Sequence, residues 1–240
     1  MTKRGWLAPT LAVAACLPIL LALGFWQLDR AEQKQQRLDR YLARGQLDVL
    51  RLPASIVDAE EFVYYRVSAS GVYDSDRQIL VDNITLRGRP GYHVITPLRM
   101  VGSDTRVLVN RGWVAWGNDR DVLPQVPPPT QLLHVQGRAV VPADDFFALR
   151  DESNADARDL RWQNLDMNRF ASFAEYPVQP IVILLDPDAE GDVLSREWDV
   201  PQDIWIQRHR AYAFQWFALA LTLVVLYLFY RRRGRSIERS

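Results

Sequence analysis

Three side chains near the C-terminal end of the chain are spaced to bind a cofactor that contains a metal. His209, Tyr212 and Trp216 recur at intervals of three and four residues, so they share one face of a helix. An imidazole at the edge of an apolar helix can ligate haem iron axially. His209 is therefore a candidate metal ligand, and Tyr212 and Trp216 are candidate cofactor-binding residues. A membrane anchor is the other interpretation, because Tyr and Trp gather at membrane interfaces and the neighbouring Arg208 and Arg210 suit lipid headgroups.

Two glutamines lie close to these residues in apolar surroundings. Gln27 shares a helix face with Gly24, and Gln215 lies one turn inside the apolar segment that contains Ala213. In lipid, a hydrogen bond between an amide side chain and a neighbouring helix contributes about 0.6–2 kcal/mol, and small residues let helices approach closely. Gly24, Gln27, Ala213 and Gln215 therefore form the predicted interface between two helices, with Gln27 and Gln215 at similar depth.

Two long apolar runs must position these residues. Residues 6–28 and 211–230 each contain about 20 positions without a charged side chain, enough to cross a hydrocarbon core of ~30 Å. The chain therefore reads as a membrane protein with a two-helix transmembrane hairpin and one extracytoplasmic domain. The predicted divisions are an N-terminal transmembrane helix (1–31), a β-rich domain (32–207), a C-terminal transmembrane helix (208–230) and a basic tail (231–240).

The basic residues predict the orientation of the hairpin. Five arginines follow the second run, and Lys3 and Arg4 precede the first. Positively charged flanks stay on the cytoplasmic side, so both termini should be cytoplasmic and the domain periplasmic. Basic residues that follow the first run, such as Arg30 and Lys34, oppose this orientation, but they precede a long segment, which weakens their influence. No transit peptide rich in Arg and Ser precedes the first run, which favours a bacterial inner membrane.

A formal charge of zero hides a segregation of charge. The 29 acidic residues all lie between the apolar runs except Glu238, whereas seven of the 29 basic residues lie outside them. The domain between the runs is therefore acidic, at about −6, which argues against a nucleic-acid partner. The lipid bilayer is the partner that the sequence itself indicates.

The domain between the runs is predicted to be rich in β-structure. Short runs of β-branched and aromatic residues are punctuated by Gly, Asp and Asn, which is typical of antiparallel hairpins, either as a sheet or curled into a barrel. A helix is expected around Met167–Ala174 after the cap Asp166. The predicted strands cover residues 62–67 leading into 71–73, then 78–81, 92–96, 106–109, 131–141 and 181–185.

No catalytic motif emerges, so the chain is not expected to be an enzyme. The three histidines are not accompanied by a Gly-x-Ser-x-Gly turn, a phosphate-binding loop or a dinucleotide fingerprint. The paired acidic residues Asp144 and Asp145 fit a surface turn. Residues 186–197 place acidic residues around Gly191 at the spacing of a calcium loop. Because Leu194 stands where a water-bridging ligand is usual, an acidic turn is the preferred interpretation.

Four segments of the chain resemble the Surfeit locus protein 1 family of cytochrome c oxidase assembly factors. They occur in the family's order and at similar spacing, and together with the hairpin they cover the chain from end to end. The segments are Gly24-Phe25-Trp26-Gln27 with Arg30 and Lys34, Gly91-Tyr92-His93-Val94-Ile95-Thr96-Pro97, Val109-Asn110-Arg111-Gly112-Trp113-Val114, and His209 with Tyr212-Ala213 and Trp216-Phe217.

The resemblance implies a role in assembling a haem-copper terminal oxidase, by helping haem a enter the large subunit or by stabilising that subunit. It implies haem a as the cofactor, His209 as the iron ligand, and the oxidase large subunit and the haem a synthesis machinery as partners. The sequence departs from the family beside the ligand, with Arg208 and Arg210 where Asn and Leu are common. A structural chaperone that binds oxidase subunits and no cofactor remains the alternative. The second and third of the four segments, around His93 and around Arg111, are the two central signatures of the family. In them His93 fits a structural role, and Asn110 to Trp113 fit a turn with a core-packing Trp and a salt-bridged Arg.

Overall fold

The computed structural model describes residues 7–117, 119, 122–142, 160–189, 194–198 and 203–237. These residues form two compact units. One lies within Met1–Arg40 and Val200–Ser240, and the other within Tyr41–Asp199. The first unit is helical and the second is rich in β-structure, and each is described by itself. The predicted pair Asp144 and Asp145 lies outside the described residues.

The helical unit is built from the two apolar runs. Helix α1 spans Leu7–Gly45 and helix α4 spans Asp203–Ile237, so both extend beyond the apolar runs. Each is long and apolar enough to cross a membrane, and only 6% and 11% of their most apolar stretches are buried. A core helix of a soluble protein would be mostly buried. The exposed apolar surface suits lipid, and the chain is a membrane protein, as the sequence predicts.

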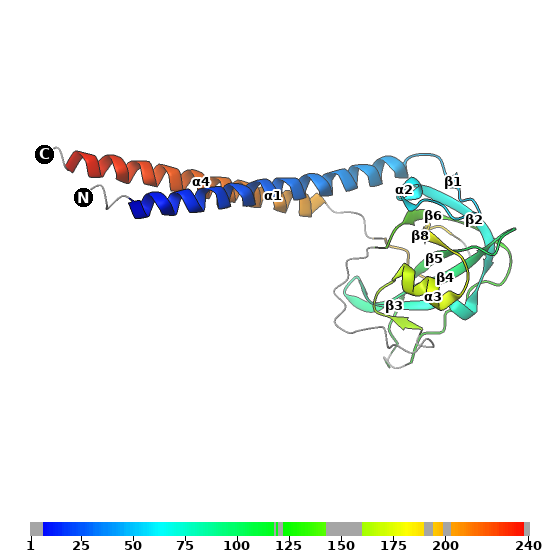
Figure 1. Cartoon of the computed structure of the whole chain (residues 1–240). Coiled ribbons are helices and arrows are strands. Elements are labelled where there is room, and N and C mark those ends of the chain that lie inside the picture. Colours follow the sequence, from blue (N-terminus) through cyan, green and yellow to red (C-terminus); the bar gives the residue numbers. More distant parts are fainter. Residues whose placement is uncertain are drawn as a thin grey trace. The chain divides into compact units, whose positions relative to one another are not determined.

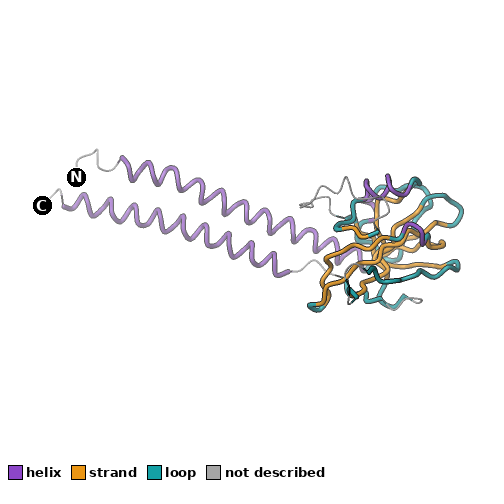
Figure 2. The backbone as a smooth tube through the Cα atoms, turned by 90° about the horizontal axis from the view of Figure 1, so that it is seen from below, coloured by secondary structure: helices purple, strands orange, loops and turns teal. Residues whose placement is uncertain are grey.

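The two helices run antiparallel and side by side (Figure 2). The hydroxyl groups of Thr10 and Tyr227 are 2.9 Å apart, and further along the pair Gln27 meets His209. The residues of each helix that are covered where the two helices meet recur at steps of three and four residues. This is the 3.5-residue repeat of two helices in a left-handed coiled coil. The covered residues are Leu17, Leu20, Gly24, Gln27 and Ala31 in α1, and Ile206, His209, Ala213, Phe217 and Ala220 in α4.

The described residues of the β-rich unit form eight strands, most of which are labelled in Figure 1. Short runs of β-branched and apolar residues form them, as the sequence predicts. The strands are β1 (Leu50–Arg51), β2 (Arg66–Tyr73), β3 (Ile79–Leu86), β4 (Arg89–Met100), β5 (Arg106–Ala115), β6 (Leu133–Val140), β7 (Arg161–Trp162) and β8 (Val178–Leu185).

Five of these strands close into a barrel in the order β2-β6-β8-β5-β4, because β4 also pairs with β2. The barrel alternative of the sequence analysis is therefore confirmed. The expected antiparallel pairing holds for the other neighbours in the barrel, but β5 and β8 pair in parallel, with Val109 opposite Ile183. The two edge pairs, β1 with β2 and β3 with β7, are also parallel. Parallel neighbours need a crossover connection, and residues 116–177, which include β6 and α3, connect β5 to β8.

The core of the β-rich unit lies inside the barrel and under one short helix. Inward-facing residues such as Val67, Leu98, Val109 and Ile183 are buried. Outside the barrel, α3 (Met167–Ala174) covers one side by packing Phe170 against a second buried cluster. Alternation along the strands thus buries apolar side chains on the barrel's inner face and under α3.

Local sequence signals explain the short helices. The Asp166 side chain accepts hydrogen bonds from the backbone N–H groups of Asn168 and Arg169, so the predicted cap of α3 is confirmed. The predicted strand start at residue 62 is wrong, because Asp58 caps a one-turn helix, α2 (Ala59–Phe62), and β2 begins only at Arg66. A 3₁₀ turn, η2 (Ser75–Arg77), occupies the expected turn after β2.

Candidate functional site

A hydrogen bond between the two long helices forms the centre of the candidate site. His209 Nδ1 lies 2.6 Å from Gln27 Oε1, and the contact is partly buried. A carbonyl oxygen only accepts, so Nδ1 is the donor in this arrangement. Within the part of the chain that the structure describes, His209 makes no other hydrogen bond. The second ring nitrogen, Nε2, therefore has no hydrogen-bond partner among the described residues, and in the neutral imidazole it is the nitrogen that carries the lone pair.

Small residues bring the two helices close enough for this contact. Ala213, one turn beyond His209, is 1% exposed, and Gly24, one turn before Gln27, is buried. A Cβ atom added at Gly24 would lie 2.6 Å from the Phe217 ring. The Phe25 ring meets the same Phe217 ring edge to face, with the centroids 5.3 Å apart. Close packing on both sides therefore fixes the position of the Gln27 and His209 side chains.

The other predicted site residues lie around this contact in different environments. Trp216 is partly buried, whereas the Tyr212 side chain is 51% exposed and lies at the margin of the helix pair. Gln215 is exposed, and no described residue forms a hydrogen bond with its side chain. Gln27 meets His209 rather than Gln215. The structure thus brings Gly24, Gln27, Ala213 and His209 together and leaves Gln215 and Tyr212 facing outward.

The donor set and the charges at this position fit haem. An imidazole nitrogen without a protein partner can coordinate iron, and the aromatic Tyr212 and Trp216 can cover a flat apolar ring. The exposed guanidinium groups of Arg208 and Arg210 flank His209 in the sequence and can pair with carboxylates such as the haem propionates. The residues present are therefore of the types that this cofactor needs.

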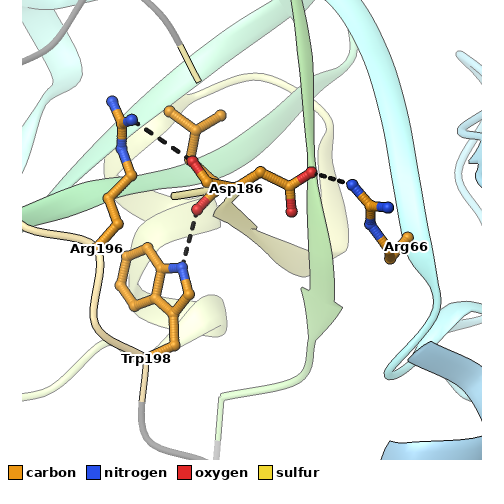
Figure 3. Close-up of polar contacts among 5 residues, drawn as sticks. Arg66, Asp186, Arg196 and Trp198 are labelled. Atoms are coloured by element: carbon orange, nitrogen blue, oxygen red, sulfur yellow. Dashed lines mark hydrogen bonds and ion pairs between the residues drawn. The ribbon is translucent and has the colours of Figure 1, made fainter. Parts of the chain in front are cut away.

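In the segment 186–197, which has the spacing of a calcium loop, carboxylate and carbonyl oxygen atoms accept hydrogen bonds from arginine side chains (Figure 3). The Asp186 carboxylate forms an ion pair with Arg66, and the Glu197 carboxylate accepts from Arg87 Nε at 3.1 Å. Arg196 Nη1 donates to the backbone carbonyl of Ala189 at 2.6 Å and also reaches those of Pro187 and Asp186. Among the described residues no cluster suited to a metal ion is found. Glu190, Gly191 and Asp192 lie outside the described residues.

The central signature around Arg111 lies within a strand, which corrects the expectation of a turn. Val94 pairs with Gly112 and Ile95 with Asn110, so Arg111 is the extra residue of a β-bulge in β5. Its side chain is 0% exposed, and Nη1 donates to Gln78 Oε1 at 2.8 Å. The same guanidinium donates to the backbone carbonyls of Val126 and Pro127, at 3.1 and 3.2 Å. Arg111 therefore fastens the segment that contains Val126 and Pro127 to the barrel.

His93, from the other central signature, has a structural environment. Its ring meets the Trp198 ring edge to face at 5.6 Å, and the Trp198 indole nitrogen donates to the Leu185 carbonyl at 2.8 Å. This packing holds the segment after β8 against β4.

The buried arginines were the main feature that the sequence analysis missed. Their signal was a single Arg within a run of strand-forming residues, as at Arg111.

Comparison with known proteins gives a consistent result over most of the chain. The model of the SURF1 family matches residues 14–221. A SURF1-like protein of Rickettsia felis is 26% identical over 240 residues, which covers 95% of this chain and 98% of the relative. A SURF1-like protein of Rickettsia prowazekii is 25% identical and covers 89% and 85% of the two chains. Surfeit locus protein 1 of Arabidopsis thaliana is 34% identical over 110 residues, 40% of this chain and 30% of the relative.

Proposed function

Since this chain belongs to the SURF1 family, generally known as cytochrome oxidase assembly factors, we propose that it assists the assembly of a haem-copper terminal oxidase. It holds haem a for insertion into the large subunit of that oxidase, or it stabilises that subunit while haem enters. The observation that carries this proposal is the His209–Gln27 contact, which leaves a nitrogen ligand at the helix pair. The oxidase large subunit is the principal partner. The haem a synthesis machinery is a second partner, from which the cofactor would be received.

The chain's own residues divide the work of binding. When bound, haem a supplies an iron that accepts a nitrogen lone pair. His209 would provide that nitrogen from α4, and Tyr212 and Trp216 would cover the ring and exclude water. Arg208 and Arg210 pair with carboxylates at the polar edge. A single protein ligand, His209, would keep the binding reversible, as a protein that passes its cofactor on requires.

The proposed location is a bacterial inner membrane with both termini in the cytoplasm. The arginines that follow Tyr230 support this orientation, because basic flanks resist translocation. Residues of about 32–207, including the barrel, would then be periplasmic. A reporter that is active only in the periplasm should be silent when fused after Ser240 and active when inserted at the exposed turn at Gly102. The reverse pattern would contradict the orientation.

Replacement of His209 tests the haem role. His209→Ala and His209→Lys should each lose the haem that copurifies with the full chain co-expressed with the haem a pathway, measured as pyridine haemochrome. Oxidase haem content should fall in the same cells. Both variants should accumulate in the membrane, because little apolar area is removed. His134→Ala is the matched control, since His134 lies on the barrel and contacts Ser70. Full haem loading of His209→Lys would contradict ligation by His209.

One observation favours a second function, that of a structural chaperone for oxidase subunits that binds no cofactor. The exposed Gln215 amide lies within the apolar part of α4, where an amide gains from a hydrogen bond to a neighbouring helix. If this function held, Gln215→Leu would reduce oxidase assembly, while His209→Ala would leave assembly and haem content unchanged.

A further inference from the structure

We propose that Gln27 is a positioning residue that holds His209 in the tautomer with the proton on Nδ1, so that the Nε2 lone pair is available to iron. This inference rests on the proposed function for the use of Nε2. The tautomer itself is a property of the two helices and can be measured without haem.

The hydrogen bond between the two side chains determines where the proton lies. A neutral imidazole has one N–H and one bare nitrogen, and the two tautomers differ in which nitrogen is which. Gln27 Oε1 can only accept, and it stands 2.6 Å from Nδ1. The proton therefore lies on Nδ1. Without this acceptor, both tautomers would be populated, and the form with the proton on Nε2 cannot bind a metal through that atom.

The surroundings of the pair leave no competing partner. Within the described residues, neither the Gln27 amide nor the His209 ring makes another side-chain hydrogen bond. Their neighbours along the covered stripes are Gly24, Ala31 and Ala213, which offer no polar side chain. In apolar surroundings an unpaired amide or imidazole is costly, so each group keeps the other in place.

The position of the pair adds a constraint on ring orientation. Both residues occupy the stripe at which the helices meet, where a polar pair typically fixes the register of two helices. One turn before Gln27, the close contact between Gly24 and the Phe217 ring also fixes the rotation of α1. Partners that hold the second nitrogen of a ligand histidine usually contribute 10–100-fold to metal affinity. Loss of the Gln27 carbonyl should weaken haem binding within that range.

The experiment compares the full chain with three variants in detergent micelles. Gln27→Leu removes the acceptor, Gln27→Glu keeps an acceptor at the same reach, and Gln215→Leu is a matched control that removes an amide from the same helical unit without touching His209. Nitrogen-15 shifts of labelled histidine report the tautomer, with His209→Ala to assign the signal. Titration with ferric haem then gives the affinity.

We expect the unaltered chain, Gln27→Glu and Gln215→Leu to carry the proton on Nδ1 and to bind ferric haem alike. Gln27→Leu should show both tautomers and about tenfold or weaker binding. A proton on Nε2 in the unaltered chain would mean that the amide presents its NH₂ group and would overturn the proposal. Unchanged affinity in Gln27→Leu would also overturn it. Failure of the unaltered chain to bind haem, with the proton on Nδ1, would instead overturn the proposed haem role.

Discussion

Gly24 of α1 lies directly against the ring of Phe217 of α4. A Cβ atom at position 24 would stand 2.6 Å from Cε1 and 2.7 Å from Cζ of that ring, closer than real Cβ atoms come to other atoms. The Phe25 ring also meets the Phe217 ring edge to face. The two helices therefore meet at this point only because residue 24 has no side chain.

Gly24→Leu should separate the helices near the candidate site. The added side chain overlaps the Phe217 ring, and overpacking of this kind costs about 1–3 kcal/mol. The measurement is the yield of a short thiol-reactive cross-link between Gln27→Cys and His209→Cys, with Cys16 replaced by Ser. Ala22→Leu is the control, because Ala22 is exposed on the same helix. Equal yields in the two backgrounds would contradict the close contact.

Arg111→Lys should destabilise the barrel. The guanidinium reaches Gln78, Val126 and Pro127 through two nitrogen atoms, a fork that an ammonium group cannot reproduce. Loss of hydrogen bonds from a buried charged group should lower the free energy of unfolding by about 2–3 kcal/mol. Urea unfolding of the full chain in detergent, followed by tryptophan fluorescence, measures it. Arg99→Lys, at an exposed position of β4, should change it by less than about 0.5 kcal/mol.

Gly112→Ala should be more costly than alanine at another glycine with positive φ. Gly112 has a φ of +144°, and a Cβ there would lie 2.6 Å from Leu194 Cβ and 2.9 Å from the Ser195 carbonyl oxygen. Strain and overlap together should cost more than about 2 kcal/mol in the same unfolding assay. Gly102 has a φ of +77° with open space around it, so Gly102→Ala should cost only about 1 kcal/mol. Similar losses would mean that the overlap relaxes.

Tyr176 should make the barrel sensitive to alkaline pH. Burial, together with the nearby Asp74 carboxylate, raises the pKa of the Tyr176 phenol above its ordinary value of 10.0. The folded state therefore prefers the neutral phenol, and the stabilisation present below pH 10 is lost as the pH rises beyond that value. In Tyr176→Phe, the free energy of unfolding should fall less between about pH 10 and 11.5. Tyr65→Phe, which keeps Tyr176, should retain the wild-type fall.

Local sequence patterns predicted the helices and strands of the fold well, because these elements depend on residues that are neighbours in the sequence. The cap at Asp166 and the two long apolar helices are of this kind. Strand partners are not local. Nothing in Arg106–Ala115 indicates that Val178–Leu185 will lie beside it in parallel. The bulge at Arg111 was also hidden, since an Asn-Arg-Gly sequence fits a turn as well as an irregular strand.

The candidate site was predicted in its residues but not in its pairing. The sequence placed Gln27 and His209 on helix faces and suggested that the two glutamines would meet. Six residues of α-helix turn the chain by about 600°, so Gln215 points about 120° away from His209. When His209 faces α1, Gln215 must face outward. The rotation of α4 follows from the packing of Phe217 and Ala213, which the spacing of polar residues does not reveal.

The place of β8 in the barrel determines when the domain can complete itself during synthesis. β8 is the last barrel strand to be made, yet it lies between β6 and β5, and α4 begins soon after it at Asp203. A nascent chain that ends before Val178 can pair β2 with β6 and β4 with β5, but both β6 and β5 keep an unpaired edge. Open edges of this kind recruit other strands and lead to aggregation. Chains that stop before β8 therefore expose open sheet edges, and the barrel can close only after β8 has been synthesised.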